Sequence, residues 1–350
     1  MTLPPVVLGL DFGGTKIAAA VCDLAGNKLG ATVVESRGEL GAQASFGHGV
    51  ATAHGLLSGT ADGSPLVAVG VATFGIPFDD HVELAPAISG WESLAFGREL
   101  AAAFPGARIA VATDAKAGAR AEARWGALTG CDPGIYLNLG TGLAAAIVSG
   151  GRVLAGHNGA AGEIGYNLRQ AADVGLASGG RLMLEDMVSG QALARRAATA
   201  GRALSAAEVF AAAESEPKLD ELLTDFVAEL AFHVVNLAIL VDPERIAVGG
   251  GMARSWHRIQ PVLADALAKA VPYPPALVLA DFPYDAPLLG AVALAVDTAG
   301  EAGPANTANA QEDTAPPPGS QPEDDVPLGA RSTLAQSNGH SVHKVKCDAP

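Results

Sequence analysis

The sequence has few cysteines, few aromatic residues and a shortage of positive charge. Its three cysteines, Cys22, Cys131 and Cys347, are far apart and form no Cys-x-x-Cys pair, so we expect no disulfide framework. Lys and Arg number 22 against 37 Asp and Glu, and the formal net charge is −15. This charge argues against a nucleic-acid partner, because phosphates select for basic surfaces. Aromatic residues make up 5% of a chain that is 49% hydrophobic, so we expect cores packed from alanine, valine and leucine.

The sequence also shows no targeting or membrane-spanning segment. The first five residues, MTLPP, carry no basic region ahead of an apolar run, so no signal peptide is predicted. No uncharged apolar stretch reaches the roughly 18 residues that a membrane-spanning helix needs. These observations predict a cytoplasmic protein with no membrane partner. Its 350 residues are enough for two lobes with their own cores.

The first motif is residues 6–21, in which a glycine turn separates two apolar runs. This pattern predicts strand, turn, strand. The Gly13-Gly14 pair has no Cβ atoms, so backbone N–H groups can approach an anion closely. Asp11 ends the first run, and Thr15 and Lys16 follow the glycines, which suits a phosphate that carries Mg²⁺. The turn alone is equally compatible with an ordinary hairpin bearing a solvated Asp and Lys.

Residues 135–148 repeat this design, with Gly140, Thr141 and Gly142 between two apolar runs. Internal repeats are informative about the whole fold. Two strand–glycine turn–strand units predict two related lobes, each with a phosphate-binding loop. A nucleotide held between the two loops is the simplest use of the pair.

Two further motifs follow, GAAGEIG at residues 159–165 and PERIAVGGG at residues 243–251. Together with DFGGTK at 11–16 and LGTG at 139–142, they make the chain resemble the ROK family of sugar kinases and sugar-responsive repressors. That family lies in the actin/hexokinase/Hsp70 superfamily. The resemblance implies an α/β fold, the two-lobed actin-like ATPase (ribonuclease H-like) fold, with a nucleotide cleft between the lobes.

The resemblance divides the chain into three parts. A small N-terminal lobe would comprise residues 1–125 and 288–298, and a large lobe residues 126–287. Residues 299–350 are rich in Pro, Ala, Gly and acidic residues, and such a segment buries too little apolar surface to become ordered. We therefore expect a disordered acidic tail there. In the large lobe, residues 182–200 and 206–240 are expected to be mainly helical.

Asp114 is the candidate catalytic base. It follows an apolar strand predicted over residues 108–112, and phosphoryl transfer to a sugar hydroxyl needs a carboxylate that accepts the proton. The residues alone favour a different role, in which Thr113 or Asp114 caps the Ala-rich helix that follows. The resemblance reverses this preference, because an Asn-Asp pair at this position supplies the family's base. Thr113 replaces the Asn and keeps one hydroxyl for the substrate.

Glu163 is the candidate sugar ligand, because one carboxylate can accept hydrogen bonds from two neighbouring hydroxyls. Without its flanking glycines, an exposed loop glutamate would explain it better. The resemblance adds Gly75, Tyr166 and Glu185 to the substrate site. Ala87 replaces an asparagine that binds sugar in the family. With Thr113, Ala87 and Tyr166 all altered, we expect a changed or weakened sugar specificity.

The family's zinc-binding motif is missing. Tyr166 takes the place of a histidine, and residues 177–185 replace a Cys-rich run without any cysteine. Because a structural zinc site needs four Cys or His ligands, we expect no zinc. The loop must then be held by packing, and we expect it to be more mobile when the site is empty.

The resemblance implies ATP and Mg²⁺ as the nucleotide and its metal. The loop residues Gly13, Gly14, Thr15 and Lys16 would face Gly140, Thr141 and Gly142. The triplet Gly249, Gly250 and Gly251 would let the adenosine approach the backbone closely. Mg²⁺ would lie near Asp11, since this ion keeps several waters and takes one or two carboxylates.

These features predict ATP-dependent phosphorylation of a sugar hydroxyl, with a hexose such as glucose as the first substrate to test and Asp114 as general base. Two alternatives stay open. One is a non-catalytic sugar- or nucleotide-binding sensor without a DNA-binding domain, because the first strand is predicted to begin at Val6. The other is a kinase for an amino sugar or another polyol. The family resemblance also implies a homodimer.

Overall fold

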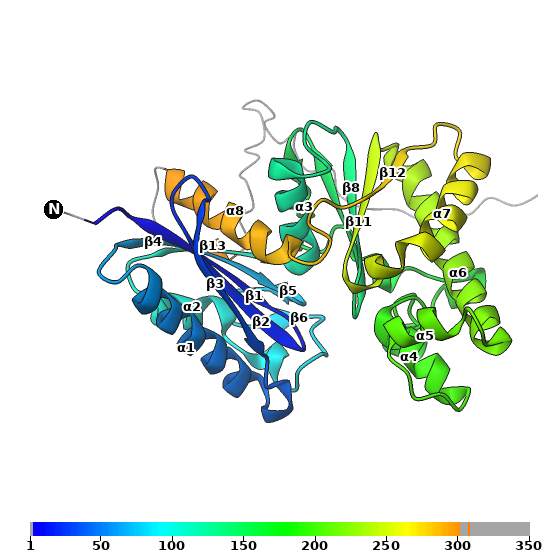
Figure 1. The fold of residues 1–350 in the computed structure, drawn as a ribbon, viewed down its shortest axis with the longest axis horizontal. Coiled ribbons are helices and arrows are strands. Elements are labelled where there is room, and N and C mark those ends of the chain that lie inside the picture. The colour runs from blue at the N-terminus through cyan, green and yellow to red at the C-terminus, as the bar shows by residue number, and fades with distance from the viewer. Residues whose placement is uncertain (1–2, 302–306, 309–350) are drawn as a thin grey trace, which may run out of the picture. The chain divides into compact units, whose positions relative to one another are not determined.

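The computed structural model describes residues 3–301 and 307–308 of the chain. Its strands form two larger sheets and one short hairpin, and helices flank both larger sheets (Figure 1). Most of the predicted tail lies outside the described residues. Where the two overlap, the prediction is wrong at two places. Residues 299 and 300 continue the last helix, and Thr307–Ala308 forms a short strand.

The first sheet has the strand order β13-β7-β4-β1-β2-β3. Its strands are β1 (Val6–Phe12), β2 (Lys16–Cys22), β3 (Lys28–Glu35), β4 (Leu66–Thr73), β7 (Arg108–Thr113) and β13 (Thr307–Ala308). β1 pairs with β2 in antiparallel fashion and with β4 in parallel fashion. The glycine turn of the first motif therefore joins β1 to β2, as the sequence predicts.

The second sheet has the order β10-β9-β8-β11-β12. Its strands are β8 (Gly134–Leu139), β9 (Leu143–Ser149), β10 (Arg152–Val153), β11 (Arg245–Gly249) and β12 (Ala276–Leu279). Here β8 is antiparallel to β9 and parallel to β11. Both sheets thus place a glycine-turn hairpin beside parallel strands in the same order, which confirms the predicted duplication. The separate hairpin joins β5 (Ile76–Pro77) and β6 (Val82–Glu83).

Eight α-helices occur among the described residues. They are α1 (Ala42–Thr60), α2 (Phe96–Ala103), α3 (Asp114–Trp125), α4 (Gly190–Thr199), α5 (Ala206–Ala212), α6 (Pro217–Val241), α7 (Trp256–Ala270) and α8 (Ala286–Gly300). The prediction of helix over 182–189 is wrong. The backbone N–H of Glu185 donates to the carbonyl of Gly165, a distant loop, and the N–H groups of Asp186 and Met187 each donate to the carbonyl three residues earlier, so the segment forms turns and not a continuous helix.

Four of the aromatic residues pack together in the core of the first lobe. The rings of Phe12, Phe46, Phe96 and Trp91 contact one another with centroids 5.6–5.8 Å apart. Phe12 comes from β1, whereas Phe46 and Phe96 come from α1 and α2. The expectation of Ala/Val/Leu packing therefore fails in this part of the core, because aromatic pairs fill the space between the sheet and these two helices.

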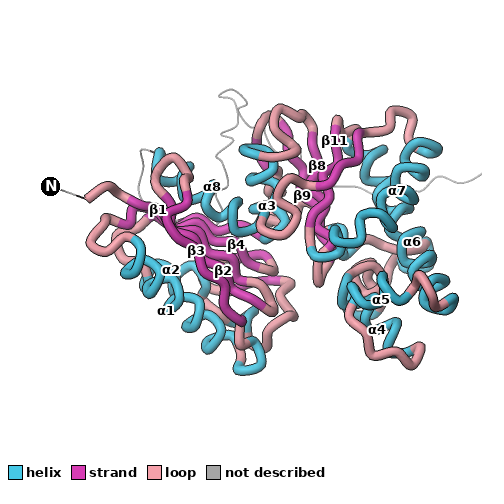
Figure 2. The backbone as a smooth tube through the Cα atoms, viewed as in Figure 1, coloured by secondary structure: helices cyan, strands magenta, loops and turns pink. Residues whose placement is uncertain are grey.

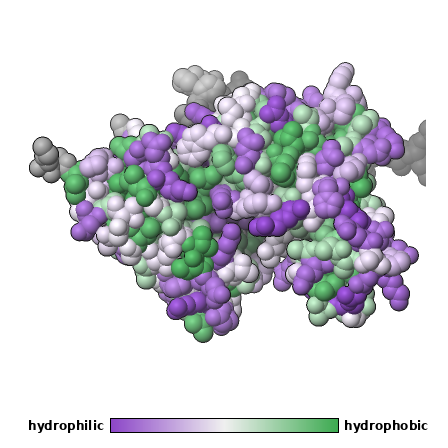
Figure 3. All heavy atoms as spheres, viewed as in Figure 1, coloured by the Kyte–Doolittle hydropathy of each residue, from purple (hydrophilic) through white to green (hydrophobic). Residues whose placement is uncertain are grey.

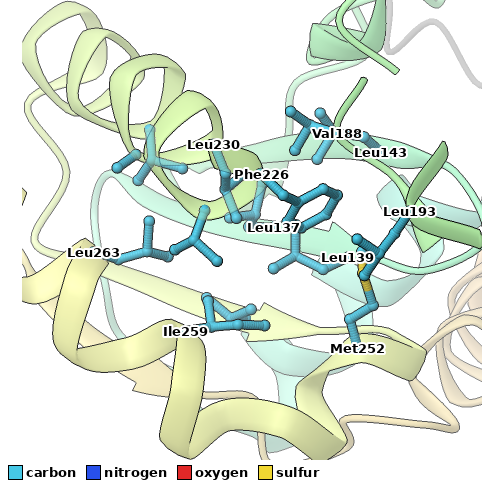
Figure 4. Close-up of a cluster of buried hydrophobic side chains, with 14 of the residues drawn as sticks. Leu137, Leu139, Leu143, Val188, Leu193, Phe226, Leu230, Met252, Ile259 and Leu263 are labelled. Atoms are coloured by element: carbon cyan, nitrogen blue, oxygen red, sulfur yellow. The ribbon is translucent and has the colours of Figure 1, made fainter. Parts of the chain in front are cut away.

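The core of the second lobe is mainly aliphatic, as expected. Leu137 of β8 packs with Phe226 and Leu230 of α6 and with Ile259 and Leu263 of α7 (Figure 4). The 25-residue α6 is long and apolar enough to cross a membrane by length and composition. Ten of its residues are buried in the lobe, so its apolar character is accounted for by this packing.

Helices α3 and α8 pack against each other between the two sheets (Figure 2). Ala119 of α3 lies in a buried cluster with β8 and β9, whereas Val292 of α8 packs on β1 and β4. Gly290 makes this contact possible, because a Cβ atom there would overlap the carbonyl of Ala117. Asp114 opens α3, so this helix pair fixes where the candidate base lies.

Candidate functional site

The first phosphate loop is braced by a residue that sequence reasoning missed. Inside the turn, the N–H of Gly13 donates to the carbonyl of Lys16 at 2.9 Å. From outside it, the buried Ser36 donates its hydroxyl to the carbonyl of Gly14 at 2.7 Å, and its N–H donates to the carbonyl of Thr15. Ser36 is 21 residues beyond Thr15, and no local pattern marks it.

The second phosphate loop is braced by the start of α4. The N–H groups of Gly190 and Gln191 donate to the carbonyls of Gly140 and Thr141, at 2.9 and 3.2 Å. These are N–H groups of the first turn, which a helix leaves without internal partners. The loop therefore has a fixed shape even though its own residues are small.

A cavity of about 420 Å³ lies beside this loop in the second lobe. Gly140, Thr141 and Gly251 line it, together with Arg254 and Phe210. A Cβ atom at Gly251 would meet open space, whereas one at Gly249 would overlap the hydroxyl of Tyr136. Gly250 has a φ of 91°, which favours glycine. The three glycines thus serve different needs, and Gly251 is the one that faces the cavity.

Asp114 follows β7 directly, and it is not the residue that caps α3. Thr113 is the N-cap of α3, and its hydroxyl accepts from the N–H of Lys116. Asp114 accepts from the N–H of Ala115 at 2.7 Å with Oδ1 and from Nδ2 of Asn138 at 3.3 Å with Oδ2. The sequence analysis missed Asn138, which lies two residues before the second phosphate loop.

Carboxylates gather around Asp114. Burial raises its pKa to about 6, and the charges of Glu163 and Glu185 add to this effect. Asp11 is affected in the same way, since burial and the charge of Asp114 raise its pKa to about 7. Four of the predicted site residues, from four separate segments, are therefore close enough to influence one another. The charges of Lys116 and Lys16 oppose these shifts at Asp114 and Asp11, respectively.

Glu163 forms an ion pair that the sequence analysis did not predict. Its Oε1 lies 3.4 Å from Nζ of Lys116, whose side chain is 8% exposed. Burial raises the pKa of Glu163, and the adjacent Lys116 lowers it. The sequence analysis did not single out Lys116.

Glu185 links the sugar loop to the second phosphate loop. Its Oε2 accepts from the N–H of Leu143 at 2.8 Å, and a Cβ atom at Gly142 would lie 2.5 Å from the same oxygen. Tyr166 belongs to the same group. Burial raises the pKa of its hydroxyl, and the charges of Glu185 and Glu163 raise it further. Gly75 has a φ of 75°, and a Cβ atom there would overlap Ala85. The backbone conformation and the close packing therefore account for a glycine at this position.

Charged side chains tie the loop in which the family resemblance implies a zinc site. Arg181 donates from Nη2 to the carbonyl of Tyr166 at 2.7 Å and from Nη1 to that of Asn167 at 3.2 Å. Arg169 pairs with Glu229 of α6. Among the described residues, no group of three or more His, Cys, Asp or Glu side chains is placed to hold a metal ion. Hydrogen bonds and an ion pair therefore contribute to holding this loop.

The comparison with protein families decides the identity of the fold. The ROK family model matches residues 7–298. The chain belongs to the ROK family. The kanosamine kinase of Amycolatopsis mediterranei (strain S699) is 32% identical to this ROK protein over 276 residues, 76% of this chain and 87% of that kinase. The bifunctional enzyme NanE/NanK of Brucella melitensis is 32% identical over 300 residues, 83% of this chain and 54% of that enzyme.

Solved ROK structures share the fold. The ROK hexokinase of Thermus thermophilus aligns with a TM-score of 0.68 and 30% identity, over 83% of this chain and 97% of that one. A ROK glucokinase of Streptomyces griseus, solved with glucose and AMPPNP, aligns with a TM-score of 0.68 and 28% identity, over 83% of this chain and 99% of that one. The fold is therefore the actin-like fold that the four motifs predict.

Proposed function

We propose that this ROK protein transfers the terminal phosphoryl group of ATP to a hydroxyl of a hexose such as glucose, with Asp114 as the general base. Its family and its named relatives make it a sugar kinase. The observation that carries the rest is the position of Asp114. This partly buried carboxylate is coupled to the candidate sugar ligands Glu163 and Glu185 and is hydrogen-bonded to Asn138 beside the second phosphate loop.

In the proposed reaction, Asp114 takes the proton of the sugar hydroxyl as its oxygen forms a bond to the γ-phosphorus. The bond from that phosphorus to the β–γ bridging oxygen breaks, and ADP leaves. Glu163 and Glu185 accept hydrogen bonds from other hydroxyls and so orient the sugar. A notch is seen on the lower side of Figure 3, and we propose it as the entry for the sugar. A base positioned in this way typically contributes about 10²–10⁴ in rate.

The residues present fit ATP and Mg²⁺. The cavity beside Gly140 and Gly251 suits the adenosine, and Lys16 with the Gly13-Gly14 turn suits the phosphates. Asp11 is a partly buried carboxylate whose pKa is raised by burial and by the charge of Asp114, and it is the residue that would hold Mg²⁺ through water. When bound, the ion neutralises charge on the phosphates. We propose no zinc.

A second candidate substrate is an amino sugar. The kanosamine kinase relative points to it. Ala87, where the family has an asparagine, gives a further reason to test sugars other than glucose.

We also propose that the protein is a cytoplasmic homodimer. The family resemblance supports this, and exposed apolar side chains on the loop and on α6 offer a surface for a second copy. They include Leu168, Val174, Leu176, Phe232 and Leu240. Sedimentation velocity over a range of concentrations tests this, and a monomer at all concentrations contradicts it.

The test of the activity is ADP release from Mg-ATP in the presence of glucose, glucosamine, kanosamine, N-acetylmannosamine and xylitol. We expect turnover with a hexose and its loss in Asp114→Asn. No turnover with any sugar, while ATP binding is retained, would overturn the proposed function.

A further inference from the structure

Lys116 enters the same site as Asp114 but belongs to none of the motifs. Its side chain is 8% exposed, and its Nζ lies 3.4 Å from Oε1 of Glu163 and 3.4 Å from Oγ1 of Thr113. A lysine is rarely buried without a partner. Here it has two, and sequence reasoning placed both of them at the substrate.

The contacts of Lys116 determine which hydrogen bond Thr113 can make. A hydroxyl has two lone pairs and one proton. The backbone N–H and the Nζ of Lys116 both donate to Oγ1, each at 3.4 Å. Both lone pairs of the Thr113 hydroxyl therefore accept from Lys116, and its proton is left to donate. It therefore presents a donor to the site.

Lys116 also determines which carboxylate oxygen of Glu163 is available to the substrate. Oε1 faces Nζ, which leaves Oε2 to accept from a sugar hydroxyl. Of the three protons on Nζ, the side chains of Thr113 and Glu163 take two within the described part of the chain. The third suits an oxygen of the substrate and not an ammonium group, which would carry the same charge.

We propose that Lys116 is a positioning residue that sets Thr113 as a donor and Glu163 as an acceptor for the sugar and selects against an ammonium group beside Glu163. This inference rests on the proposed function. It adds a specificity determinant that the four motifs do not contain.

Lys116 also affects the charge on the base. The charged groups that face Asp114 are Glu163, Glu185, Asp11 and Lys116, together with the Tyr136 hydroxyl on β8. Only Lys116 among these is a cation. Removing it leaves the carboxylates uncompensated, so their pKa values rise and the base is lost to protonation at a higher pH.

The test compares Lys116→Met, Lys116→Arg and the control Lys269→Met, whose lysine is exposed on α7 and paired with Asp265. We expect Lys116→Met to raise KM for glucose about tenfold or more while KM for ATP changes less than about twofold. The acid limb of kcat/KM should move up by roughly one pH unit. In Lys116→Met, the ratio of kcat/KM for glucosamine to kcat/KM for glucose should be higher than in the wild type. Lys116→Arg should recover much of each effect, and the control should show none.

If the wild type phosphorylates sugar and Lys116→Met leaves KM, the acid limb and the sugar preference unchanged, the inference fails while the proposed function stands. Thermal unfolding keeps the inference testable without turnover. Lys116→Met should be less stable than the wild type at pH 8, and the difference should narrow as the pH falls to 5, because burial raises the pKa of Glu163 and its protonation removes the charged partner of Lys116. A difference independent of pH, or one that Lys116→Arg does not reduce, would overturn the inference.

Discussion

Asn138 donates a hydrogen bond to Oδ2 of Asp114 at 3.3 Å, which ties the end of β8 to the first residue of α3. The N–H of Ala115 holds the other carboxylate oxygen at 2.7 Å. Both oxygens of the candidate base therefore have a partner. Since β8 continues into the second phosphate loop, the base and that loop share one support.

Replacing Asp114 by Asn should abolish most transfer without disturbing the nucleotide. We expect kcat to fall by about 10²–10⁴, because an amide cannot accept the proton. The dissociation constant for Mg-ATP should stay within about twofold, since the cavity near Gly251 is unchanged. Steady-state kinetics and calorimetry measure the two quantities. Asp265→Asn on the exposed face of α7 is the matched control, and turnover near the wild-type value in Asp114→Asn would refute the role.

The activity should have an acid limb set by Asp114. The base works in its ionised form, and burial together with neighbouring carboxylates raises its pKa to about 6. The value of kcat/KM for the sugar should therefore fall about tenfold per pH unit below this value. Initial rates between pH 5 and 8 at saturating Mg-ATP measure it. A flat profile down to pH 5 would show that Asp114 does not set this limb.

The unliganded fold should become more stable as the pH falls from 8 to about 5, apart from the effects of other groups. Asp11 and Asp114 have pKa values of about 7 and 6, above their ordinary value of 3.8. The folded state therefore binds more protons in this window. The stabilisation is fully present below pH 3.8 and is lost as the pH rises through 6 and 7. Asp114→Asn should unfold at a higher temperature than the wild type at pH 8, with a smaller difference at pH 5. An equal difference at both values would contradict this.

Replacing Gly142 by Ala should damage the sugar site more than the fold. The new Cβ atom would lie 2.5 Å from Oε2 of Glu185, the atom that accepts from the N–H of Leu143. Glu185 must move, so KM for the sugar should rise about fivefold or more, given that a typical hydrogen bond contributes about 0.5–1.5 kcal/mol. Gly55→Ala is the control, because a Cβ atom there meets nothing within 4 Å. An unchanged KM in Gly142→Ala would indicate that Glu185 does not touch the sugar.

The sugar loop should depend on Arg181 and not on a metal. Chelation with EDTA should leave the thermal unfolding curve unchanged, because the loop has no cysteine and has Tyr166 where the resemblance implies a histidine. Arg181→Met removes the donors to the carbonyls of Tyr166 and Asn167 and should lower stability by about 1–3 kcal/mol. A curve that shifts with EDTA and returns with added zinc would overturn this prediction.

Local patterns in the sequence predicted much of the fold. The short apolar runs and the glycine turns at Gly13-Gly14 and Gly140–Gly142 identify both hairpins, because apolar runs and glycine turns act over a few residues. The helix expected over 182–189 was wrong for the opposite reason. The Glu185 N–H bonds to Gly165, twenty residues earlier in the chain, and no local propensity encodes such a contact.

The sequence by itself determined the family, the duplicated hairpins and most of the candidate site residues, because these depend on short motifs and their order. Only the tertiary structure decided how those residues act on one another. In the folded chain, Thr113 caps α3 and Asp114 accepts a hydrogen bond from Asn138. Lys116 is buried against Glu163. Ser36 and Arg181 donate hydrogen bonds to backbone carbonyls of two loops. Burial, charge coupling and hydrogen bonds between loops depend on residues far apart in the chain, so they exist only once the chain is folded.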